Sequence, residues 1–198
     1  MQVPEETLVL GSGSPRRGDL LLRLGINFEI QTAGGDGPIV SDLPAARVRG
    51  HAVFKAKQVA KIKPHRWVLA ADTLVYAQGR FLSKPKGKED ARNMLHLLQS
   101  IGDHEVWTGG CLISPSGESW VRAERALVGF YPIPDLELES YLEGVEWVDK
   151  AGAYAIQGWA SSYACLREGE LDSVVGLAEI TVLGLFRAAG LPKQAFRR

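Results

Sequence analysis

Cysteine is scarce in the sequence: Cys111 and Cys165 are the two that its 198 residues contain. Two cysteines cannot build a framework of disulfides, and their spacing does not match that of a zinc site. We therefore expect both to be small buried side chains of a protein from a reducing compartment, and not catalytic thiols.

The sequence also has no excess charge of either sign. It contains 23 Lys and Arg and 23 Asp and Glu, so its formal net charge at pH 7 is zero. Affinity for a phosphate backbone needs an excess of basic residues on one surface, so this balance excludes a broadly basic nucleic-acid-binding protein. A net charge of zero is still compatible with a small local cluster of positive charge.

Long apolar runs are absent as well, and none approaches the roughly 20 residues that a membrane span requires. The first residues, Met1–Thr7, are polar and include a proline and two glutamates, unlike a signal peptide. We therefore expect a cytoplasmic protein with no membrane partner. No repeat, low-complexity stretch or long block of charge divides the chain, so we expect one domain over residues 1–198.

What the sequence does contain is an interleaving of apolar segments with the strand period and the helix period. The expected strands are Leu8–Leu10, Ile26–Ile30, Trp67–Tyr76, Phe81–Leu82, two strands around a turn at Pro115–Gly117, and Ser162–Leu166. The expected helices are Pro15–Leu24 with Ser14 as its cap, Pro44–Lys61, Lys88–Gln99, a helix to Glu143 capped by Asp135, and Ala178–Ala189. Because hairpins accompany the alternating strands and helices, we expect an α/β fold with a mixed sheet.

The strongest local motif is Ser12-Gly13-Ser14-Pro15-Arg16-Arg17, at an expected strand-to-helix junction. Free N–H groups and the positive end of the helix dipole favour an anion there, and the serines and arginines add donors suited to phosphate. The spacing matches neither a P-loop nor a dinucleotide fingerprint. A capped helix with two arginines in solvent explains the fragment equally well.

Lys55 lies on the apolar stripe of its expected helix, with Val48, Ala52, Val59 and Ile62. An ammonium group on that side should either extend into solvent or point toward an anionic partner. The sequence leaves both possibilities open.

Asp72 interrupts a run that should be buried, after Val68-Leu69-Ala70-Ala71. Buried carboxylates are uncommon unless they are paired or bind a metal, and ligands of α/β proteins gather near strand ends. A general base or a metal ligand is therefore favoured over an aspartate in a solvated loop.

The remaining polar candidates are individually ambiguous. Lys84 precedes Pro85 and is compatible with an ordinary surface turn, and Gln157 is a polar residue in an apolar setting that could contact a base edge or hold a loop. The histidines have no metal-like spacing, so no catalytic role is assigned to them: His51, His65, His96 and His104. Several cations with one carboxylate and one amide fit phosphoanhydride chemistry on a nucleotide better than acyl transfer.

The motifs together resemble the Maf family of nucleoside triphosphate pyrophosphatases. The matching segments are Ser12–Arg17, Lys55-Ala56, Ala71-Asp72-Thr73, Lys84-Pro85, Asp149–Tyr154, Ile156-Gln157-Gly158 and Val174–Leu177, in the family's order and spacing over nearly the whole chain. The resemblance implies a mixed twisted sheet with flanking helices, in two lobes around a central cleft like the inosine triphosphatases. It also implies hydrolysis of a nucleoside triphosphate to the monophosphate and pyrophosphate, a divalent cation (Mg²⁺ or Mn²⁺) and a homodimer.

The resemblance further implies roles for single residues. Asp72 corresponds to the general base. The corresponding phosphate-binding residues are Ser12, Arg16, Arg17, Lys55 and Lys84. Thr73 and Gln157, together with Arg16, match positions linked to the choice of base, and they resemble the branch that acts on dTTP and UTP.

Two positions depart from the family pattern. The acidic pair usual before the Lys55 helix is reduced here to Asp36, because Gly37 stands at the glutamate position. Asp36 is thus the remaining candidate metal ligand, and a lost carboxylate should weaken a site for a hard cation. Ala178 replaces a common proline. The alternatives are a catalytically weakened nucleotide-binding protein that acts in cell-division control, or a 7-methyl-GTP pyrophosphatase.

Overall fold

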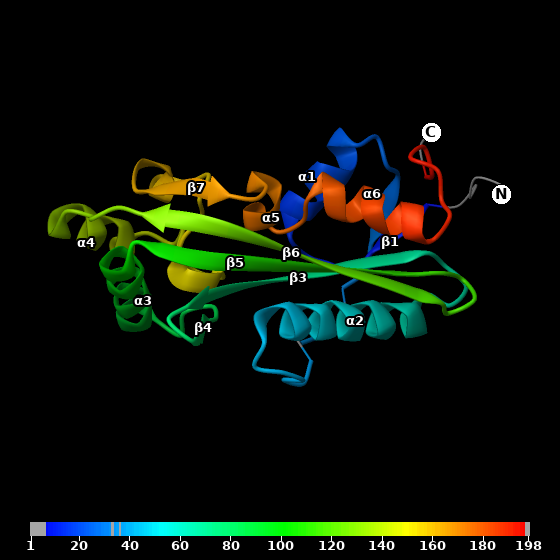
Figure 1. The fold of residues 1–198 in the computed structure, drawn as a ribbon, viewed down its shortest axis with the longest axis horizontal. Helices are drawn as coiled ribbons and strands as arrows, with labels where there is room; N and C mark the ends of the chain where they lie inside the picture. The colour runs from blue at the N-terminus through cyan, green and yellow to red at the C-terminus, as the bar shows by residue number, and fades with distance from the viewer. Residues whose placement is uncertain (1–6, 33, 36, 197–198) are drawn as a thin grey trace. The chain divides into compact units, whose positions relative to one another are not determined.

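The computed structural model describes residues 7–32, 34–35 and 37–196. Within these residues, seven strands form one mixed sheet in the order β2-β1-β3-β5-β6-β7, with β4 paired to β3 (Figure 1). β1 is parallel to β2 and β3, whereas the pairs β3–β4 and β6–β7 are antiparallel.

The strands are β1 (Leu8–Leu10), β2 (Phe28–Ile30), β3 (Val68–Ala77), β4 (Arg80–Leu82), β5 (Asp103–Ile113), β6 (Ser119–Phe130) and β7 (Ala164–Glu168). The helices are α1 (Pro15–Arg23), α2 (Pro44–Ile62), α3 (Lys88–Ile101), α4 (Asp135–Glu143), α5 (Leu171–Val175) and α6 (Glu179–Ala188), with short 3-10 turns at Ala151–Ala153 and Trp159–Ser162.

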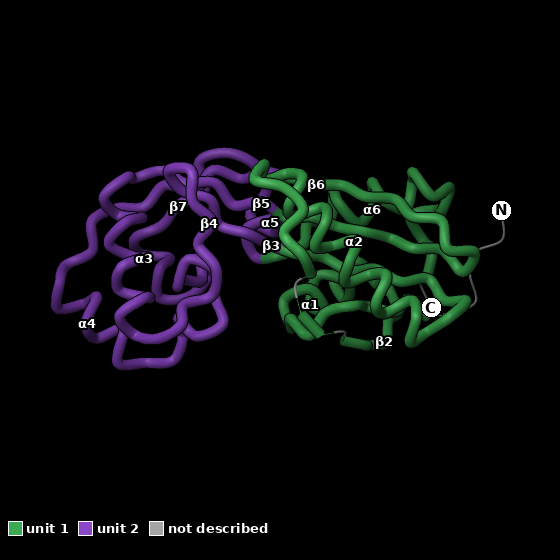
Figure 2. Tube along the Cα trace, turned by 90° about the horizontal axis from the view of Figure 1, so that it is seen from below, with its two compact units in different colours: residues 1–72, 108–124, 176–198 green, residues 73–107, 125–175 purple. Residues whose placement is uncertain are grey.

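The chain divides into two compact units (Figure 2). The first contains residues 1–72, 108–124 and 176–198, and the second contains residues 73–107 and 125–175. The chain passes from one unit to the other within β3, β5 and β6 and again at the end of α5. Neither unit is therefore a continuous stretch of sequence.

In the first unit, alternate residues of the strands belong to two different apolar clusters. Leu8 and Leu10 of β1 pack in one cluster with side chains of α1 and α6, while Val9 packs in the other with side chains of α2. Strand β3 repeats this alternation. The period of two along a strand thus puts α2 on one face of this part of the sheet and α1 and α6 on the other.

Two adjacent glycines of β5 allow helices to approach both faces closely. A Cβ atom on Gly109 would lie 2.6 Å from the carbonyl oxygen of Val48 in α2. A Cβ atom on Gly110 would lie 2.8 Å from Cγ2 of Thr181 in α6. Side chains at these positions would separate the helices from the sheet.

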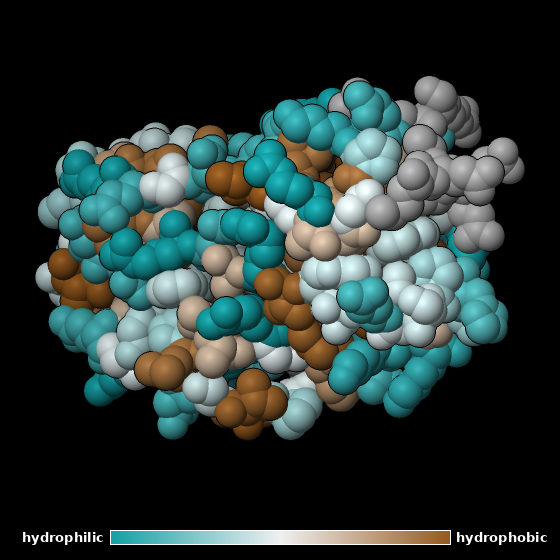
Figure 3. Space-filling model, turned by 45° about the vertical axis from the view of Figure 1, so that its right-hand side comes forward, coloured by the Kyte–Doolittle hydropathy of each residue, from teal (hydrophilic) through white to brown (hydrophobic). Residues whose placement is uncertain are grey.

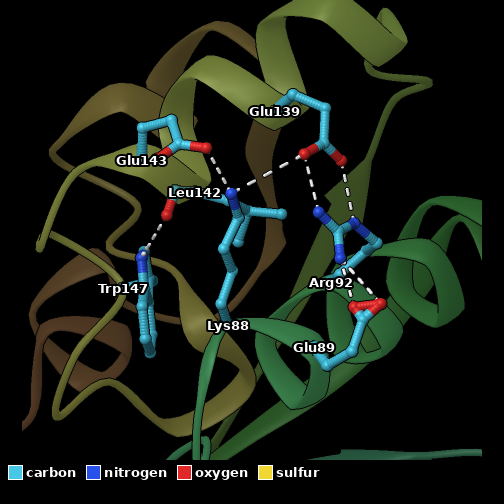
Figure 4. A network of polar contacts seen from close by, with 7 residues as sticks. All are labelled: Lys88, Glu89, Arg92, Glu139, Leu142, Glu143 and Trp147. Carbon is cyan, nitrogen blue, oxygen red and sulfur yellow. Dashed lines mark hydrogen bonds and ion pairs between the residues drawn. The ribbon is translucent and has the colours of Figure 1, made fainter.

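The second unit has its own apolar cluster, formed by β3 beyond Asp72, α3, α4 and the segment around Tyr154. Ion pairs also join α3 to α4 (Figure 4). The guanidinium of Arg92 forms a fork with the Glu139 carboxylate, with N···O distances of 2.8 and 2.6 Å, and Lys88 pairs with Glu143. These contacts fix the two helices side by side.

The predicted mixed α/β fold is confirmed, and some local predictions are wrong. Ser14 occupies the position before α1, but its side chain makes no capping hydrogen bond. Asp135 is the first residue of α4, after Pro134, instead of its cap. Ile62, expected on the buried stripe of α2, is 52% exposed, and Cys165 is half-buried where burial was expected. The expectation of one domain over residues 1–198 stays a prediction.

No helix in the described part of the chain is both long and apolar enough to cross a membrane. On the face drawn in Figure 3, hydrophobic side chains form small areas between hydrophilic ones. The exposed large hydrophobic residues include Leu22, Ile39, Val40 and Leu43. Three of these four residues lie in the segment just before α2, and exposed apolar side chains are common on protein surfaces.

Candidate active site

The candidate site of the first unit begins where β1 ends beside β3. Leu10 pairs with Leu69, and the Gly11 N–H donates to the Leu69 carbonyl oxygen at 2.7 Å. A Cβ atom on Gly11 would lie 3.1 Å from the Cβ of Ala70, so glycine permits this close approach. Because β1 and β3 are parallel, the loop that starts at Ser12 leaves the end of β1 on the side toward which β3 continues, and Asp72 lies three residues beyond Leu69 in the middle of β3.

Asp72 is buried, with 6% of its surface exposed, and both of its carboxylate oxygens have partners. Val68 and Ala70 pack against α2, and two residues further along β3 Asp72 faces the same helix. Lys55 Nζ lies 2.5 Å from Oδ1 and His51 Nδ1 lies 2.9 Å from Oδ2. His51 and Lys55 are four residues apart in α2, so their side chains share one face of the helix.

These partners determine the charge of Asp72. Burial alone would raise the pKa of its carboxyl group, because it disfavours the charged form. The hydrogen bond from His51 and the positive charges of Lys55 and Arg17 outweigh burial and hold the pKa below its usual value. Asp72 is therefore ionised at neutral pH.

The arginine motif is linked to the C-terminal part of the first unit. Arg17 donates from Nη1 to the Ser12 hydroxyl at 2.8 Å and from Nε to the carbonyl oxygen of Gly176 at 2.9 Å. Gly176 has a φ of +133°, which favours glycine. Ser12 is buried, while Arg16 is exposed. The first turn of α1 therefore carries two guanidinium groups, and that of Arg17 is held by contacts with both Ser12 and Gly176.

The second unit holds Thr73, Lys84 and Gln157. Lys84 Nζ lies 3.7 Å from Asp149 Oδ1, and both side chains are largely exposed. Thr73 follows Asp72 in β3 and is half-buried, whereas Gln157 is exposed.

The segment that carries Gln157 is fixed by an acidic side chain. Glu146 Oε1 accepts a hydrogen bond from the Trp159 backbone N–H at 3.0 Å. A Cβ atom on Gly158 would lie 1.9 Å from that same oxygen. Glycine after Gln157 thus leaves room for the carboxylate of Glu146.

The described residues do not form a metal site by themselves. Asp36, the predicted ligand, lies outside the described residues, and no three His, Cys, Asp or Glu side chains within the described ranges are grouped as a metal would require. Both oxygens of Asp72 are engaged by Lys55 and His51. Since hard cations need several oxygen ligands, this donor set does not fit a cation held by the protein alone.

Gly37 leaves no room for the glutamate that the family pattern places there. Its φ is +86°, and a Cβ atom would lie 2.6 Å from Cγ of Phe54 in α2. Restoring a glutamate at this position would strain the backbone and displace an aromatic ring. Gly37→Glu is therefore not a simple test of metal affinity.

The structure joins predicted site residues in two contacts, Ser12 with Arg17 and Lys55 with Asp72. Lys84 instead contacts Asp149, which was not a predicted site residue. Sequence reasoning missed His51, to which no role was given. The available signal was its position four residues before Lys55, on the same face of the helix.

The fold and the site define a class: a mixed α/β protein with a buried, ionised carboxylate on a strand of the sheet, among cationic side chains. A solved structure with the same fold is that of the nucleoside-triphosphatase / dITP/XTP pyrophosphatase from Mycobacterium abscessus. It superimposes with a TM-score of 0.51 over 93% of this chain and 98% of that chain, at 14% sequence identity.

The chain belongs to the Maf family: the model of the Maf-like proteins matches residues 7–189. Curated relatives are about 40% identical in sequence to this chain over nearly their whole length. The dTTP/UTP pyrophosphatase of Moorella thermoacetica is 41% identical over 186 residues, which are 93% of this chain and 95% of that protein. The dTTP/UTP pyrophosphatase of Deinococcus radiodurans is 38% identical over 193 residues, 96% of this chain and 97% of that protein.

Proposed function

We propose that this protein hydrolyses nucleoside triphosphates to the monophosphate and pyrophosphate, with dTTP, UTP or modified pyrimidine nucleotides as substrates. The observation that carries the proposal is the buried, ionised Asp72 in the middle of β3, near the point where β1 ends and the motif of Ser12 and Arg17 begins. The names of the relatives, dTTP/UTP pyrophosphatase, support the reaction and the pyrimidine preference.

In the proposed reaction, water attacks a phosphorus atom and the link between the α- and β-phosphates breaks. Asp72 accepts the proton that the attacking water loses. A carboxylate with a low pKa is a weak base, so most of the rate enhancement comes from charge neutralisation and positioning. Arg16, Arg17 and Lys55 supply positive charge, and the Ser12 hydroxyl is a further phosphate contact.

For the residues of the second unit, the proposed roles rest on the family resemblance. Lys84 would add a phosphate contact, and Thr73 and Gln157 would contact the base. A divalent cation, Mg²⁺ or Mn²⁺, would arrive as part of the nucleotide complex, because Mg²⁺ is commonly held by one or two carboxylates together with substrate phosphates. A homodimer and a cytoplasmic location also belong to this proposal and rest on the same resemblance.

A panel of nucleotides tests the proposal. The purified protein is incubated with dTTP, UTP, CTP and 7-methyl-GTP and with Mg²⁺ or Mn²⁺, and pyrophosphate and orthophosphate are measured separately. We expect equimolar pyrophosphate and monophosphate, fastest from dTTP or UTP. Release of orthophosphate would refute the reaction, and fastest turnover of 7-methyl-GTP would refute the pyrimidine preference.

The weakened nucleotide-binding protein remains the second candidate, and the observation that favours it is Gly37 packed against Phe54 at the usual position of an acidic residue. In the same panel, tight nucleotide binding without turnover at either metal would decide for it. Calorimetric titration with each nucleotide provides that binding measurement.

A further inference from the structure

His51 contacts the carboxylate to which the proposed function gives the central role. Its Nδ1 lies 2.9 Å from Asp72 Oδ2, and its side chain is 8% exposed. The carboxylate oxygen can only accept a hydrogen bond when Asp72 is ionised, so Nδ1 must carry the proton and donate. The contact therefore fixes the tautomer of the imidazole.

The other nitrogen of the ring is also informative. Nε2 of His51 is buried and has no hydrogen-bond partner in the part of the chain that the structure describes. A proton on Nε2 would be a buried donor without an acceptor, which is unfavourable. The ring is therefore suited to one state, the neutral tautomer that donates from Nδ1 to Asp72.

Lys55 and His51 differ in how they can respond when a triphosphate binds. Lys55 carries its charge on a flexible chain, its side chain is 17% exposed, and an added polyphosphate would attract the ammonium. His51 has a short side chain enclosed between α2 and the sheet, so it has little freedom to turn toward a phosphate. Binding of a triphosphate is therefore expected to draw on Lys55 and to leave the contact between His51 and Asp72 in place.

We propose that His51 is a positioning residue that holds the Asp72 carboxylate in its reactive orientation while Lys55 is engaged by the phosphates. The inference rests on the proposed function. The two donors then have separate roles: Lys55 binds the phosphates, and His51 holds Asp72 in place.

Variants that differ in one hydrogen bond test this role. His51→Leu removes the donor and keeps a side chain of similar size, whereas His51→Asn places an amide N–H near the position of Nδ1. We expect kcat to fall about 100-fold in His51→Leu with KM nearly unchanged, because a misplaced catalytic group affects the chemical step. We expect His51→Asn to recover most of this loss. His96→Leu, the same change at an exposed histidine of α3, is the control and should retain full activity.

The outcomes separate the inference from the proposed function. If the wild-type protein releases pyrophosphate and His51→Leu has wild-type kcat, the inference is wrong and the function stands. Equal losses in the Leu and Asn variants would also overturn it, since a donor near the position of Nδ1 would then make no difference to kcat. Thermal melting of each variant shows whether it is folded.

A readout that does not depend on turnover is the imidazole signal of His51 in ¹⁵N NMR spectra, assigned by its loss in the Leu variant. We expect a neutral, Nδ1-protonated ring both without nucleotide and with a UTP analogue that has a methylene group between the α- and β-phosphates. Loss of the Nδ1 proton on binding the analogue would contradict the proposed role, even in a protein that proves to be inactive.

Discussion

At the scale of single residues, the position of Asp72 follows from strand geometry. The period of two that turns Val68 and Ala70 toward α2 also turns Asp72 toward it, where Lys55 meets it. A carboxylate in this position would be unfavourable without these partners, because burial disfavours its charge. Its burial follows from the period of the strand, and its ionisation from the partners His51 and Lys55 and the charge of Arg17.

Replacing Asp72 by asparagine tests its role as the base. Asp72→Asn preserves the size of the side chain but removes the proton acceptor, so we expect kcat to fall by roughly 10²- to 10⁴-fold. Nucleotide affinity should change little, because the proposed phosphate contacts of Arg16, Arg17 and Lys55 remain in the variant. Steady-state kinetics and calorimetric titration measure the two quantities, and unchanged turnover would remove Asp72 from this role.

Arg17 is expected to contribute to stability as well as to phosphate binding. Arg17→Lys cannot keep both the contact with Ser12 and that with Gly176, because an ammonium lacks the planar fork. We expect a loss of about 1–3 kcal/mol in the free energy of unfolding, from one or two hydrogen bonds. KM for the triphosphate should rise at the same time. Urea unfolding of the variant measures the loss of stability. Arg16→Lys, at the exposed neighbouring residue, should raise KM without this loss.

At the scale of elements, the distance between α2 and β5 positions both partners of Asp72. Gly109→Ala would place a methyl group 2.6 Å from the Val48 carbonyl oxygen, so the helix must move. We expect a destabilisation of about 1–3 kcal/mol. Because Lys55 and His51 move with the helix, kcat should also fall, by about 10- to 100-fold.

Gly34→Ala is the matched control for this substitution, because a Cβ atom there meets nothing within 4 Å. Denaturant unfolding and pyrophosphate release compare the two variants. If Gly109→Ala were as stable and as active as Gly34→Ala, the close approach of α2 would not matter for the site.

Periodicity and turn residues were sufficient to predict most elements and the mixed sheet. They also favoured a buried role for Asp72, but they left open whether Lys55 extends into solvent or points toward an anionic partner. They could not predict that these two residues meet, because a continuous apolar strand does not reveal which helix covers which face. The role of His51 was missed for the same reason, since its partner lies in another element. Contacts between distant segments carry this information, and local patterns do not.

At the scale of the whole molecule, stability in mild acid should depend on His104. This residue of the second unit is buried and bonded to the Tyr154 hydroxyl at 2.6 Å, and burial lowers its pKa to about 4. Below about pH 6.5 this histidine binds a proton in the unfolded chain but not in the folded protein. The free energy of unfolding therefore falls as the pH decreases toward 4. This difference between the pKa values of His104 in the folded and unfolded states corresponds to a loss of about 3 kcal/mol in the free energy of unfolding.

His104→Gln provides the test, because its amide can bond to the Tyr154 hydroxyl but does not titrate. We expect urea unfolding of the wild-type protein to weaken more steeply between pH 6.5 and 4 than that of the variant. Parallel profiles would show that His104 is not the group responsible.

The division of the chain into two interleaved units has a consequence for its synthesis. Every residue of the second unit has been synthesised once residue 175 is added, whereas the core of the first unit contains both Leu8 and Phe186. Domains usually fold in the order in which they leave the ribosome. The core of the first unit is complete only when α6 has been synthesised. The second unit can therefore fold on the nascent chain, while the segments that carry Ser12 and Asp72 acquire their core after it.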